Sequence, residues 1–298
     1  MEIKNNNSFE NILFYYFTTI DNLEEFKEVL LHKSVELSLK GTILLAHEGI
    51  NGCLSGNVDE TQAFMNFIRS DERFKNIVFK RTPAQGHTFK KLVVRIKPEI
   101  IRLDRADLTN EHAAPFIQPH ELKKMLDNGE AIMVDMRNDY EARIGKFKDA
   151  VVTSMKTFRE LPEKINEISQ LKNIKDKKIV TYCTGGIRCE KATALLRENG
   201  FENIYQLEGG IIEYGKECGN EHWEGKCFVF DSRLAIDVDP NHPSEPTTIK
   251  EMLKQALVTD EFDFMKDAIT NYKGYILEQN DPELHELYLQ AKKKVAEM

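Results

Sequence analysis

Residues 178–188 read KIVTYCTGGIR, a run that changes character halfway along its length. Its first five residues are mostly β-branched or aromatic, which predicts a strand at the centre of a sheet. Residues 189–199 have helical spacing and are followed by Gly200, a typical helix stop. The segment therefore predicts a strand, a tight glycine-containing loop and a helix.

The loop places a cysteine where its thiolate form is favoured. Cys183 ends the predicted strand, and two glycines and a helix start follow it. Backbone N–H groups and the positive end of a helix form a cradle for an anion, and Arg188 adds a fixed cation. The alternative is an inert, buried cysteine. Glycines and an arginine have no packing purpose at these positions, so we expect a nucleophile. The N–H groups of the cradle would come from Thr184, Gly185, Gly186 and Ile187.

The length of the loop indicates which group it can hold. Four residues separate Cys183 from Arg188, whereas cysteine phosphatases, which share the strand–loop–helix arrangement, use five. The shorter ring suits a sulfur atom carried on the cysteine better than a phosphate. Cys189 lies six positions after Cys183. It is either a thiol that attacks an oxidised or persulfidated Cys183, or a small packing residue.

Motifs around the loop resemble the rhodanese family over roughly residues 118–218. They are VDMR at 134–137, Glu141, Gly145 and LEGGI at 207–211. Helix and strand patterns alternate between these points, which indicates a parallel sheet with helical crossovers. The resemblance implies a persulfide on Cys183. We expect Asp135 and Arg137 to form a structural ion pair beneath the loop.

Length and composition limit the class of protein. The 298 residues predict about two domains, and 41% hydrophobic residues are enough for ordinary cores. No apolar run can span a bilayer, and residues 1–10 are too polar for a signal peptide. Five cysteines suit a reducing cytoplasm. The net charge of −8 argues against a chain that coats nucleic acid uniformly, but leaves room for a local basic site.

The first hundred residues show a different pattern of apolar and polar residues. Apolar runs and helical patterns predict the order βαββαβ of a ferredoxin-like or acylphosphatase-like domain. The expected strands are 11–19, 42–46, 52–55, 76–81 and 91–96, and the expected helices are 23–36 and 58–69. We therefore expect this domain at 1–100, a linker at 101–117, the rhodanese-like domain at 118–220 and an extension with a helical tail at 221–298.

A basic strip runs through the end of this first domain. Nine Lys or Arg stand against two acidic residues, and Phe89 is available to stack on a base. Such a strip is typical of a surface that meets phosphates, but a solvated edge strand is an equally good interpretation. Lys90, Lys91 and Arg95 are the candidate contacts with nucleic-acid phosphates. The strip consists of Lys75, Lys80, Arg81, Lys90, Lys91, Arg95, Lys97, Arg102 and Arg105.

A polar turn between two predicted strands reads HEGING at 47–52. A plain hairpin would need only an Asn-Gly pair. His47 and Glu48 could transfer a proton or hold a base edge together with Asn51, or they could simply be exposed strand-end residues.

The first domain and the rhodanese-like domain together are similar to the bacterial tRNA uridine hydroxylase family, from about Phe14 to Asp231. The motifs are AHEGIN at 46–51, DMRN at 135–138, TFRE at 157–160, YCTGGIRCEK at 182–191 and EGGIIEY at 208–214. The resemblance implies oxygen-dependent formation of 5-hydroxyuridine at the wobble position of tRNA, with molecular oxygen as co-substrate. It makes the anticodon region of tRNA the expected partner. No dinucleotide-binding fingerprint is present, so no other cofactor is expected.

The tail departs from many members of that family, which carry a cysteine-rich stretch here. Residues 228–298 contain no cysteine, and 14 acidic residues outnumber 8 basic ones. After a linker at 239–243, helical patterns cover 249–258, 261–277 and 282–297. Cys218, His222 and Cys227 are too few for a zinc site, so no metal is predicted.

Three functions remain open from the sequence. The first is a cytoplasmic tRNA-modifying enzyme that depends on Cys183, with Arg188 stabilising the anionic sulfur. The second is a sulfurtransferase that moves sulfane sulfur through a Cys183 persulfide. The third is a non-catalytic module that binds RNA through the basic strip. The intact loop disfavours the third, and the additional first domain disfavours a minimal sulfurtransferase. The oligomeric state is left open, and no contact with a membrane is expected.

Overall fold

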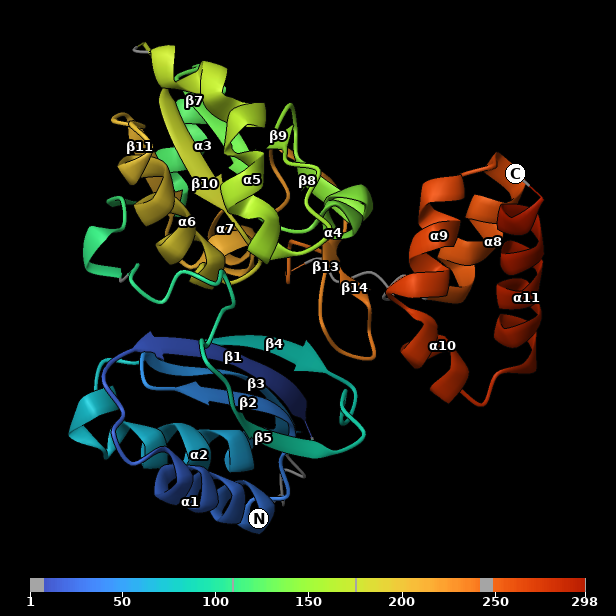
Figure 1. The fold of residues 1–298 in the computed structure, drawn as a ribbon. Coiled ribbons are helices and arrows are strands. Elements are labelled where there is room, and N and C mark those ends of the chain that lie inside the picture. Colours follow the sequence, from blue (N-terminus) through green and yellow to red (C-terminus); the bar gives the residue numbers. More distant parts are fainter. Residues whose placement is uncertain (1–7, 109, 175, 242–248, 298) are drawn as a thin grey trace.

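The computed structural model describes residues 8–108, 110–174, 176–241 and 249–297. Three parts follow one another along the chain: a sandwich of one sheet and two helices, an α/β domain, and a bundle of helices (Figure 1). The α/β domain lies between the other two along the sequence and contacts both. Residues 1–7 and the second half of the predicted linker, 242–243, lie outside the described residues.

The first part is built on a mainly antiparallel sheet in the order β4-β1-β3-β2-β5, in which β5 pairs with β2 in parallel. The predicted βαββαβ order is confirmed, and the further strand expected at 91–96 is present as the edge strand β5. The two helices have the predicted bounds. The elements are β1 (Phe9–Phe17), α1 (Leu23–Glu36), β2 (Lys40–Ala46), β3 (Gly49–Asn57), α2 (Val58–Arg69), β4 (Phe79–Ala84) and β5 (Leu92–Ile96).

The two faces of this sheet have different partners. Ile12 and Phe14 of β1 belong to the core under α1 and α2, whereas Leu13 and Tyr15 point to the opposite face because side chains alternate along a strand. Both helices cover one face, and the α/β domain lies over the other (Figure 1). The sheet therefore serves as a floor for the second domain.

The α/β domain contains a parallel sheet in the order β6-β11-β10-β7-β9, with β10 at its centre. The predicted central strand, Lys178–Tyr182, is confirmed. The helix after the loop begins at Ile187 rather than at Cys189, so Arg188 lies in its first turn. The elements are β6 (Phe116–Ile117), α3 (Pro119–Asp127), β7 (Ala131–Asp135), α4 (Asp139–Ile144), β8 (Gly145–Phe147), β9 (Val151–Val152), α5 (Leu161–Lys164), β10 (Lys178–Tyr182), α6 (Ile187–Glu198), β11 (Ile204–Leu207) and α7 (Gly210–Cys218).

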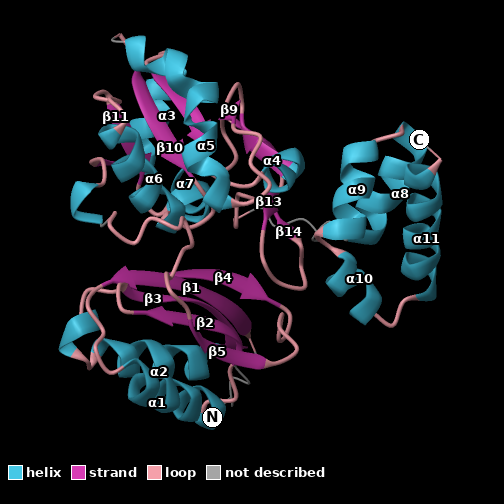
Figure 2. Cartoon of the chain, viewed as in Figure 1, coloured by secondary structure: helices cyan, strands magenta, loops and turns pink. Residues whose placement is uncertain are grey.

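The last part joins the α/β domain before it becomes helical. β12 pairs with β8, and β13 and β14 form a hairpin (Figure 2). Four helices follow, and their core is continuous with Ile144 of α4 and Phe228 of β13. The elements are β12 (Trp223–Gly225), β13 (Cys227–Phe228), β14 (Ala235–Ile236), α8 (Ile249–Thr259), α9 (Phe262–Thr270), α10 (Lys273–Glu278) and α11 (Pro282–Ala296).

One predicted helix of the tail was wrong. Residues 261–277 form two helices, α9 and α10, instead of one. Thr270 and Asn271 end α9, and their side chains bond back to Lys266 O and Asp267 Oδ1 of the preceding turn. Tyr272 is buried at the break. None of the helices in the described part of the chain is long and apolar enough to cross a membrane.

Candidate active site

Cys183 lies at the carboxyl end of the central strand β10, at the entrance of the tight loop. Its side chain is only 1% exposed, and the backbone N–H of Gly186 donates a hydrogen bond of 3.1 Å to its Sγ. Gly186 has a φ of 102°, a left-handed conformation that glycine adopts without strain. Of the four N–H donors expected from the sequence, Gly186 bonds to the sulfur, and the backbone N–H of Arg188 is a further donor.

The surroundings of Cys183 favour the thiolate. Burial alone would raise the pKa of this thiol. A hydrogen bond from the Cys189 thiol, the charge of Arg188, and the N–H groups of Arg188 and Gly186 outweigh burial and lower the pKa from 9.0 to about 5. At neutral pH the sulfur is therefore an anion in a buried site.

Arg188 is held in place by a carboxylate from another element. Glu141 of α4 accepts hydrogen bonds from both terminal nitrogens of Arg188, with 2.9 Å between Nη2 and Oε2. This two-pronged pair fixes the plane of the guanidinium group. Thr184 Oγ1 lies 3.5 Å from Nη2. Glu141 is a site residue that the sequence showed only as one point of a resemblance, because nothing near it in the sequence reveals its partner.

Cys189 contacts the reactive sulfur from the core side. It is fully buried in the apolar core of the α/β domain. Burial raises the pKa of the Cys189 thiol, and the neighbouring anionic Cys183 raises it further. The neutral Cys189 thiol thus donates a hydrogen bond to Cys183. Cys189 therefore occupies a packing position, which was one of the two alternatives. It also contacts the Cys183 sulfur.

A buried ion pair supports the underside of the loop, as predicted. Asp135 ends β7 and accepts hydrogen bonds of 2.9 and 2.6 Å from Nε and Nη2 of Arg137. Tyr182, which directly precedes Cys183, donates a bond of 2.7 Å to the same carboxylate. All three side chains are inaccessible to solvent. The pair has a structural role, since it fixes the strand end that carries the nucleophile.

The floor sheet closes over the loop from the other side. A Cβ atom on Gly185 would lie 2.6 Å from Leu13 Cδ2, and one on Gly186 would lie 3.0 Å from the Tyr15 hydroxyl. The expectation that these glycines have no packing purpose was therefore wrong. They leave room for β1 of the first domain as well as shaping the anion cradle, which sequence spacing within one domain could not reveal.

A second polar cluster lies where the two domains meet behind the loop. Tyr15 donates a hydrogen bond of 3.2 Å to Glu190 of α6, and the Lys80 ammonium lies 5.1 Å from the Tyr15 ring centroid. Lys80 is 6% exposed, and burial lowers its pKa although the Cys183 sulfur opposes this. Burial also raises the pKa of Glu190. A cation from the first domain thus faces the site of the second.

A cavity of about 460 Å³ opens beside Cys183, between the two domains. It is mostly apolar, and it has the size of a small-molecule site. One wall is the Cys183 loop with Arg188, and the opposite wall is the free face of the floor sheet. The residues from that face are Asn11, Leu13, Tyr15, Thr42, Leu44, Asn51, Gly52, Cys53 and Thr82, and the other lining residues include Phe89, Phe158 and Phe230.

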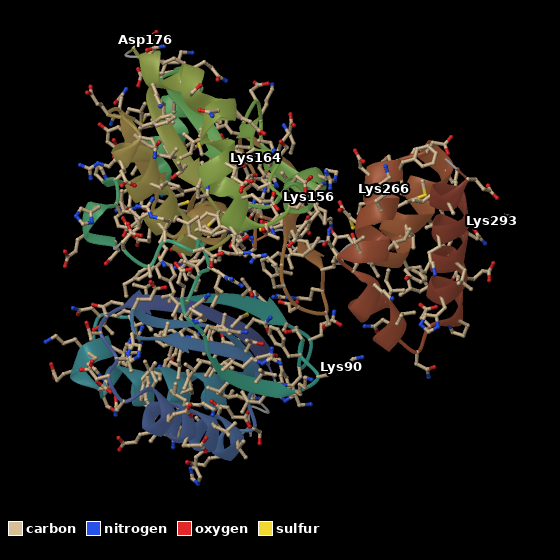
Figure 3. All side chains as sticks on the ribbon, viewed as in Figure 1. Lys90, Lys156, Lys164, Asp176, Lys266 and Lys293 are labelled. Carbon is tan, nitrogen blue, oxygen red and sulfur yellow. The ribbon has the colours of Figure 1, made fainter. Side chains whose placement is uncertain are left out.

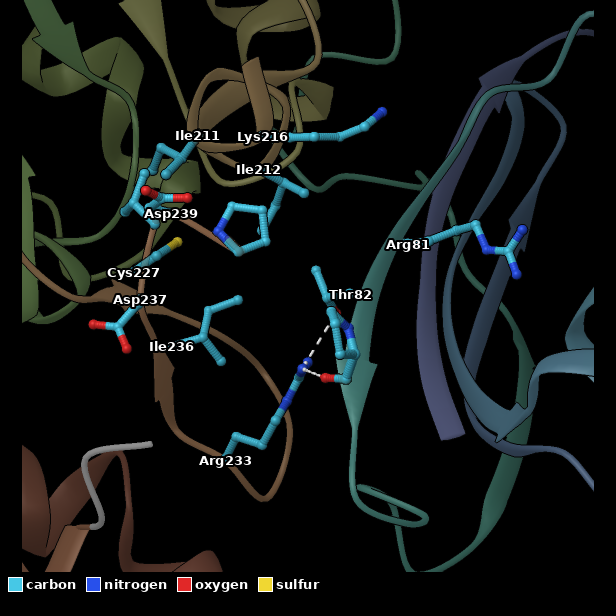
Figure 4. A pocket seen from close by; sticks show the side chains of 13 residues that line it. Arg81, Thr82, Ile211, Ile212, Lys216, Cys227, Arg233, Ile236, Asp237 and Asp239 are labelled. Carbon is cyan, nitrogen blue, oxygen red and sulfur yellow. Dashed lines mark hydrogen bonds between the residues drawn. The ribbon is translucent and has the colours of Figure 1, made fainter. Parts of the chain in front are cut away.

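The hairpin of β13 and β14 closes one end of this cavity. Asp231 pairs with Arg233 at 2.6 Å and accepts a bond of 2.8 Å from Asn11 of β1. Arg233 donates to Thr82 Oγ1 and to the Pro83 carbonyl, as Figure 4 shows from the side of a smaller cavity. The hairpin tip is therefore tied to the first domain by charged hydrogen bonds.

Of the three residues expected from the polar turn, only Asn51 reaches the cavity. His47 Nδ1 bonds to the Ile20 carbonyl. Glu48 accepts bonds of 2.7 Å from Lys191 Nζ and from the Ile100 backbone N–H. Lys191 is fully buried and also bonds to Glu99 at 2.7 Å. Glu48 therefore links the two domains, and its candidate role in tRNA binding stays a prediction.

The basic strip is not one continuous surface. Lys80 is buried, and Arg81 pairs with Glu10 at 2.7 Å. Lys90, Lys91 and Arg95 are exposed on or next to the edge strand β5, and Figure 3 shows Lys90 at the rim of the first domain. Lys90, Lys91 and Arg95 therefore lie in the exposed part of a divided strip.

The cysteines near the tail are not gathered. Cys218 Sγ lies 3.6 Å from His120, and His222 bonds to Asp127 at 2.7 Å, while Cys227 is buried elsewhere. Across the described ranges no group of three or more His, Cys, Asp or Glu side chains is arranged to hold a metal ion.

Comparison with known proteins agrees with this architecture. Residues 9–100 match the family model of the UPF0176 acylphosphatase like domain, and residues 118–217 match that of the rhodanese-like domain. Both expected domain types are thereby confirmed.

Three curated relatives carry the name tRNA uridine(34) hydroxylase. The protein from Cytophaga hutchinsonii is 44% identical over 238 residues, covering 79% of this chain and 75% of its own. The protein from Oceanobacillus iheyensis is 41% identical, covering 80% and 74%. The protein from Bacillus licheniformis is 44% identical, covering 78% and 73%.

Proposed function

We propose that this chain, which belongs to the tRNA uridine(34) hydroxylase family, hydroxylates the wobble uridine of tRNA to 5-hydroxyuridine. The observation that carries the proposal is the position of the Cys183 anion, in the wall of a cavity of about 460 Å³ that both domains line. A plain sulfurtransferase needs no such second wall. The reaction places one atom of molecular oxygen on the base and reduces the other to water, with two electrons and two protons from a reductant.

The chemistry of uracil explains why a sulfur anion is useful here. The carbon–carbon double bond of uracil is conjugated with a carbonyl group, so its 6-carbon accepts a nucleophile. Addition of the Cys183 sulfur there, as thiolate or persulfide, would make the 5-carbon electron-rich and reactive toward oxygen. Loss of the 5-proton and departure of the sulfur then restore the double bond. Arg188 and the loop N–H groups stabilise the sulfur anion before addition and after release.

The substrate region is the anticodon loop. A base in such a loop leaves its stack at less cost than a base in a duplex, so it can enter a buried cavity. The exposed Lys90, Lys91 and Arg95 lie on the domain that forms the cavity floor, where they would contact the phosphates. We place the protein in the cytoplasm, where tRNA is found.

The experiment that tests this function is nucleoside mass spectrometry of tRNA from cells with and without the gene. We expect 5-hydroxyuridine or its derivatives at the wobble position to disappear without the gene and to return with the wild-type chain. The Cys183→Ser chain should not restore them. Unchanged 5-hydroxyuridine in cells without the gene would contradict the proposal.

The second candidate is sulfur transfer through a Cys183 persulfide. It is favoured by one observation, the four-residue loop that fits a sulfur atom, with its Gly186 N–H 3.1 Å from Sγ. A thiosulfate-to-cyanide assay on the purified protein tests it. Thiocyanate formation without any change in tRNA would favour this candidate over hydroxylation.

A further inference from the structure

Two phenylalanine side chains among the described residues are largely exposed, and only one of them lies at the cavity. Phe116 is 45% exposed on the edge strand β6, and Phe230 is 61% exposed. Phe230 lines the cavity beside Cys183, and the Arg188 guanidinium lies 6.0 Å from its ring centroid. Phe230 is left largely exposed at the cavity, although burial of an apolar side chain would be more favourable.

The ring is nevertheless held firmly. Phe228 packs against it edge to face, with 4.9 Å between centroids. The next residue, Asp231, is locked by Arg233 and by Asn11 of the first domain. Val229 donates a backbone bond of 2.8 Å to Leu234 across the hairpin. Phe230 is therefore held in position by its neighbours. A ligand that stacks on it causes little further loss of side-chain conformational entropy.

We propose that Phe230 is the stacking platform for the target pyrimidine, and this inference rests on the proposed function. A flat, uncharged base of a single-stranded segment is the ligand that fits an exposed phenyl ring at the mouth of a mostly apolar cavity. Stacking on Phe230 holds the extruded base beside the wall that carries Cys183. Asn51 of β3, whose Nδ2 bonds to the Ile100 carbonyl at 2.9 Å, has its amide fixed in the opposite wall.

The role predicts a specific pattern in kinetics. A base stacks on Phe230 in the bound state and during the reaction alike, so its loss should raise KM and leave kcat nearly unchanged. Phe230→Ala should raise KM for an anticodon stem–loop roughly 5- to 150-fold. Phe230→Trp should restore the wild-type KM because it keeps an aromatic face. Phe116→Ala is the matched control, because it removes an exposed ring that does not line the cavity, and should change neither constant.

Folding defects are separated from stacking by a conservative variant. Phe230→Leu keeps an apolar side chain against Phe228 but has no ring to stack on a base. Its thermal melting temperature should match the wild type, while its KM should rise as in Phe230→Ala. A folded Phe230→Leu variant with wild-type KM would overturn the proposal.

A photochemical experiment tests the contact without relying on turnover. An anticodon stem–loop with 5-bromouridine at the target position is bound to the wild-type protein, irradiated and digested, and the adduct is mapped by mass spectrometry. We expect the adduct on Phe230, and its loss in Phe230→Leu. An adduct only on other residues would overturn the stacking role. A wild-type protein that forms this adduct but makes no 5-hydroxyuridine would instead refute the proposed function and leave the stacking contact standing.

Discussion

Most steps of the proposed reaction depend on one atom, the sulfur of Cys183. The low pKa of Cys183 arises from hydrogen-bond donors around its sulfur. The pKa values of the other cysteines are raised instead. Burial raises the pKa of Cys53 and of Cys227 to about 12. The difference between these thiols should be visible in their reactivity.

Alkylation by iodoacetamide measures this difference directly. The pKa of Cys183 is depressed, so its thiolate persists as the pH falls until about 5. Its alkylation rate should stay nearly constant from about pH 8 to 6, whereas the rate of an ordinary thiol falls about tenfold per unit below its pKa of about 8.5. Peptide mapping should also show Cys183 modified before Cys53 and Cys227. A rate for Cys183 that follows the ordinary thiol would contradict the anion cradle.

Arg188 should not tolerate exchange for lysine. Arg188→Lys keeps a charge but loses the planar fork that binds Glu141, so the charge moves away from the sulfur. We expect kcat for tRNA hydroxylation to fall about 10- to 100-fold, as for the loss of a charged hydrogen bond. Arg102→Lys, on the surface beside Asp104, is the control and should keep full activity. If Arg188→Lys keeps the wild-type rate, the loop N–H groups suffice.

At the scale of elements, α4 connects the tail to the active site. Its Glu141 holds Arg188, and its Arg143 pairs with the buried Asp267 of α9. Tyr140 of α4 also packs edge to face on Tyr272, with 6.0 Å between centroids. The helical tail therefore supports the element that orients Arg188, a role that requires no metal.

Breaking the ion pair between α4 and α9 should weaken this support. Asp267→Asn removes the charge that binds Arg143, and we expect the free energy of unfolding to fall by about 2 kcal/mol. Urea unfolding followed by circular dichroism measures the loss. Glu283→Gln is the control, because its pairs with Lys250 and Lys254 are exposed to solvent and their loss should change the stability far less. An Asp267→Asn chain as stable as the wild type would show that this contact does not support α4.

Elements with a strong local signal were predictable from the sequence. The helices 23–36 and 58–69 and the strand 178–182 have clear periodicity, and the structure has them at those bounds. The break at Tyr272 was not predictable, because it depends on burial of that side chain against a distant hairpin. The strand that begins at Gly49 was likewise hidden by its polar residues, and only His47 and Glu48 form the turn.

At the scale of the whole molecule, the function depends on how two domains meet. Lys191 of α6 is buried between Glu48 and Glu99, and Tyr15 reaches Glu190 across the same interface. These contacts fix the floor sheet over the Cys183 loop and so create the cavity. Sequence patterns predicted each domain and its reactive loop, but not their contact. Spacing along a chain says nothing of which distant side chains meet.

The exposed end of the basic strip belongs to this scale, because it should guide tRNA to the cavity. Replacing Lys90, Lys91 and Arg95 by Glu should weaken tRNA binding and flatten its dependence on salt. The reason is that fewer counterions are released when the protein contacts fewer phosphates. Filter binding at several salt concentrations measures both. Charge reversal at Lys273, Lys292 and Lys293 of the tail is the matched control and should change neither. Sulfur transfer from a small donor should survive in both variants. Wild-type affinity and salt dependence after the first change would mean that this edge is merely solvated.

In the proposed reaction, Cys183 directs an oxygen atom from molecular oxygen onto the wobble uridine. The most direct measurement supplies purified protein and a reductant with unmodified tRNA under isotopically heavy oxygen gas, followed by nucleoside mass spectrometry. We expect 5-hydroxyuridine that carries the heavy isotope with the wild-type chain, and none with Cys183→Ser. Product that takes its oxygen from water, or heavy product from the Cys183→Ser chain, would contradict it.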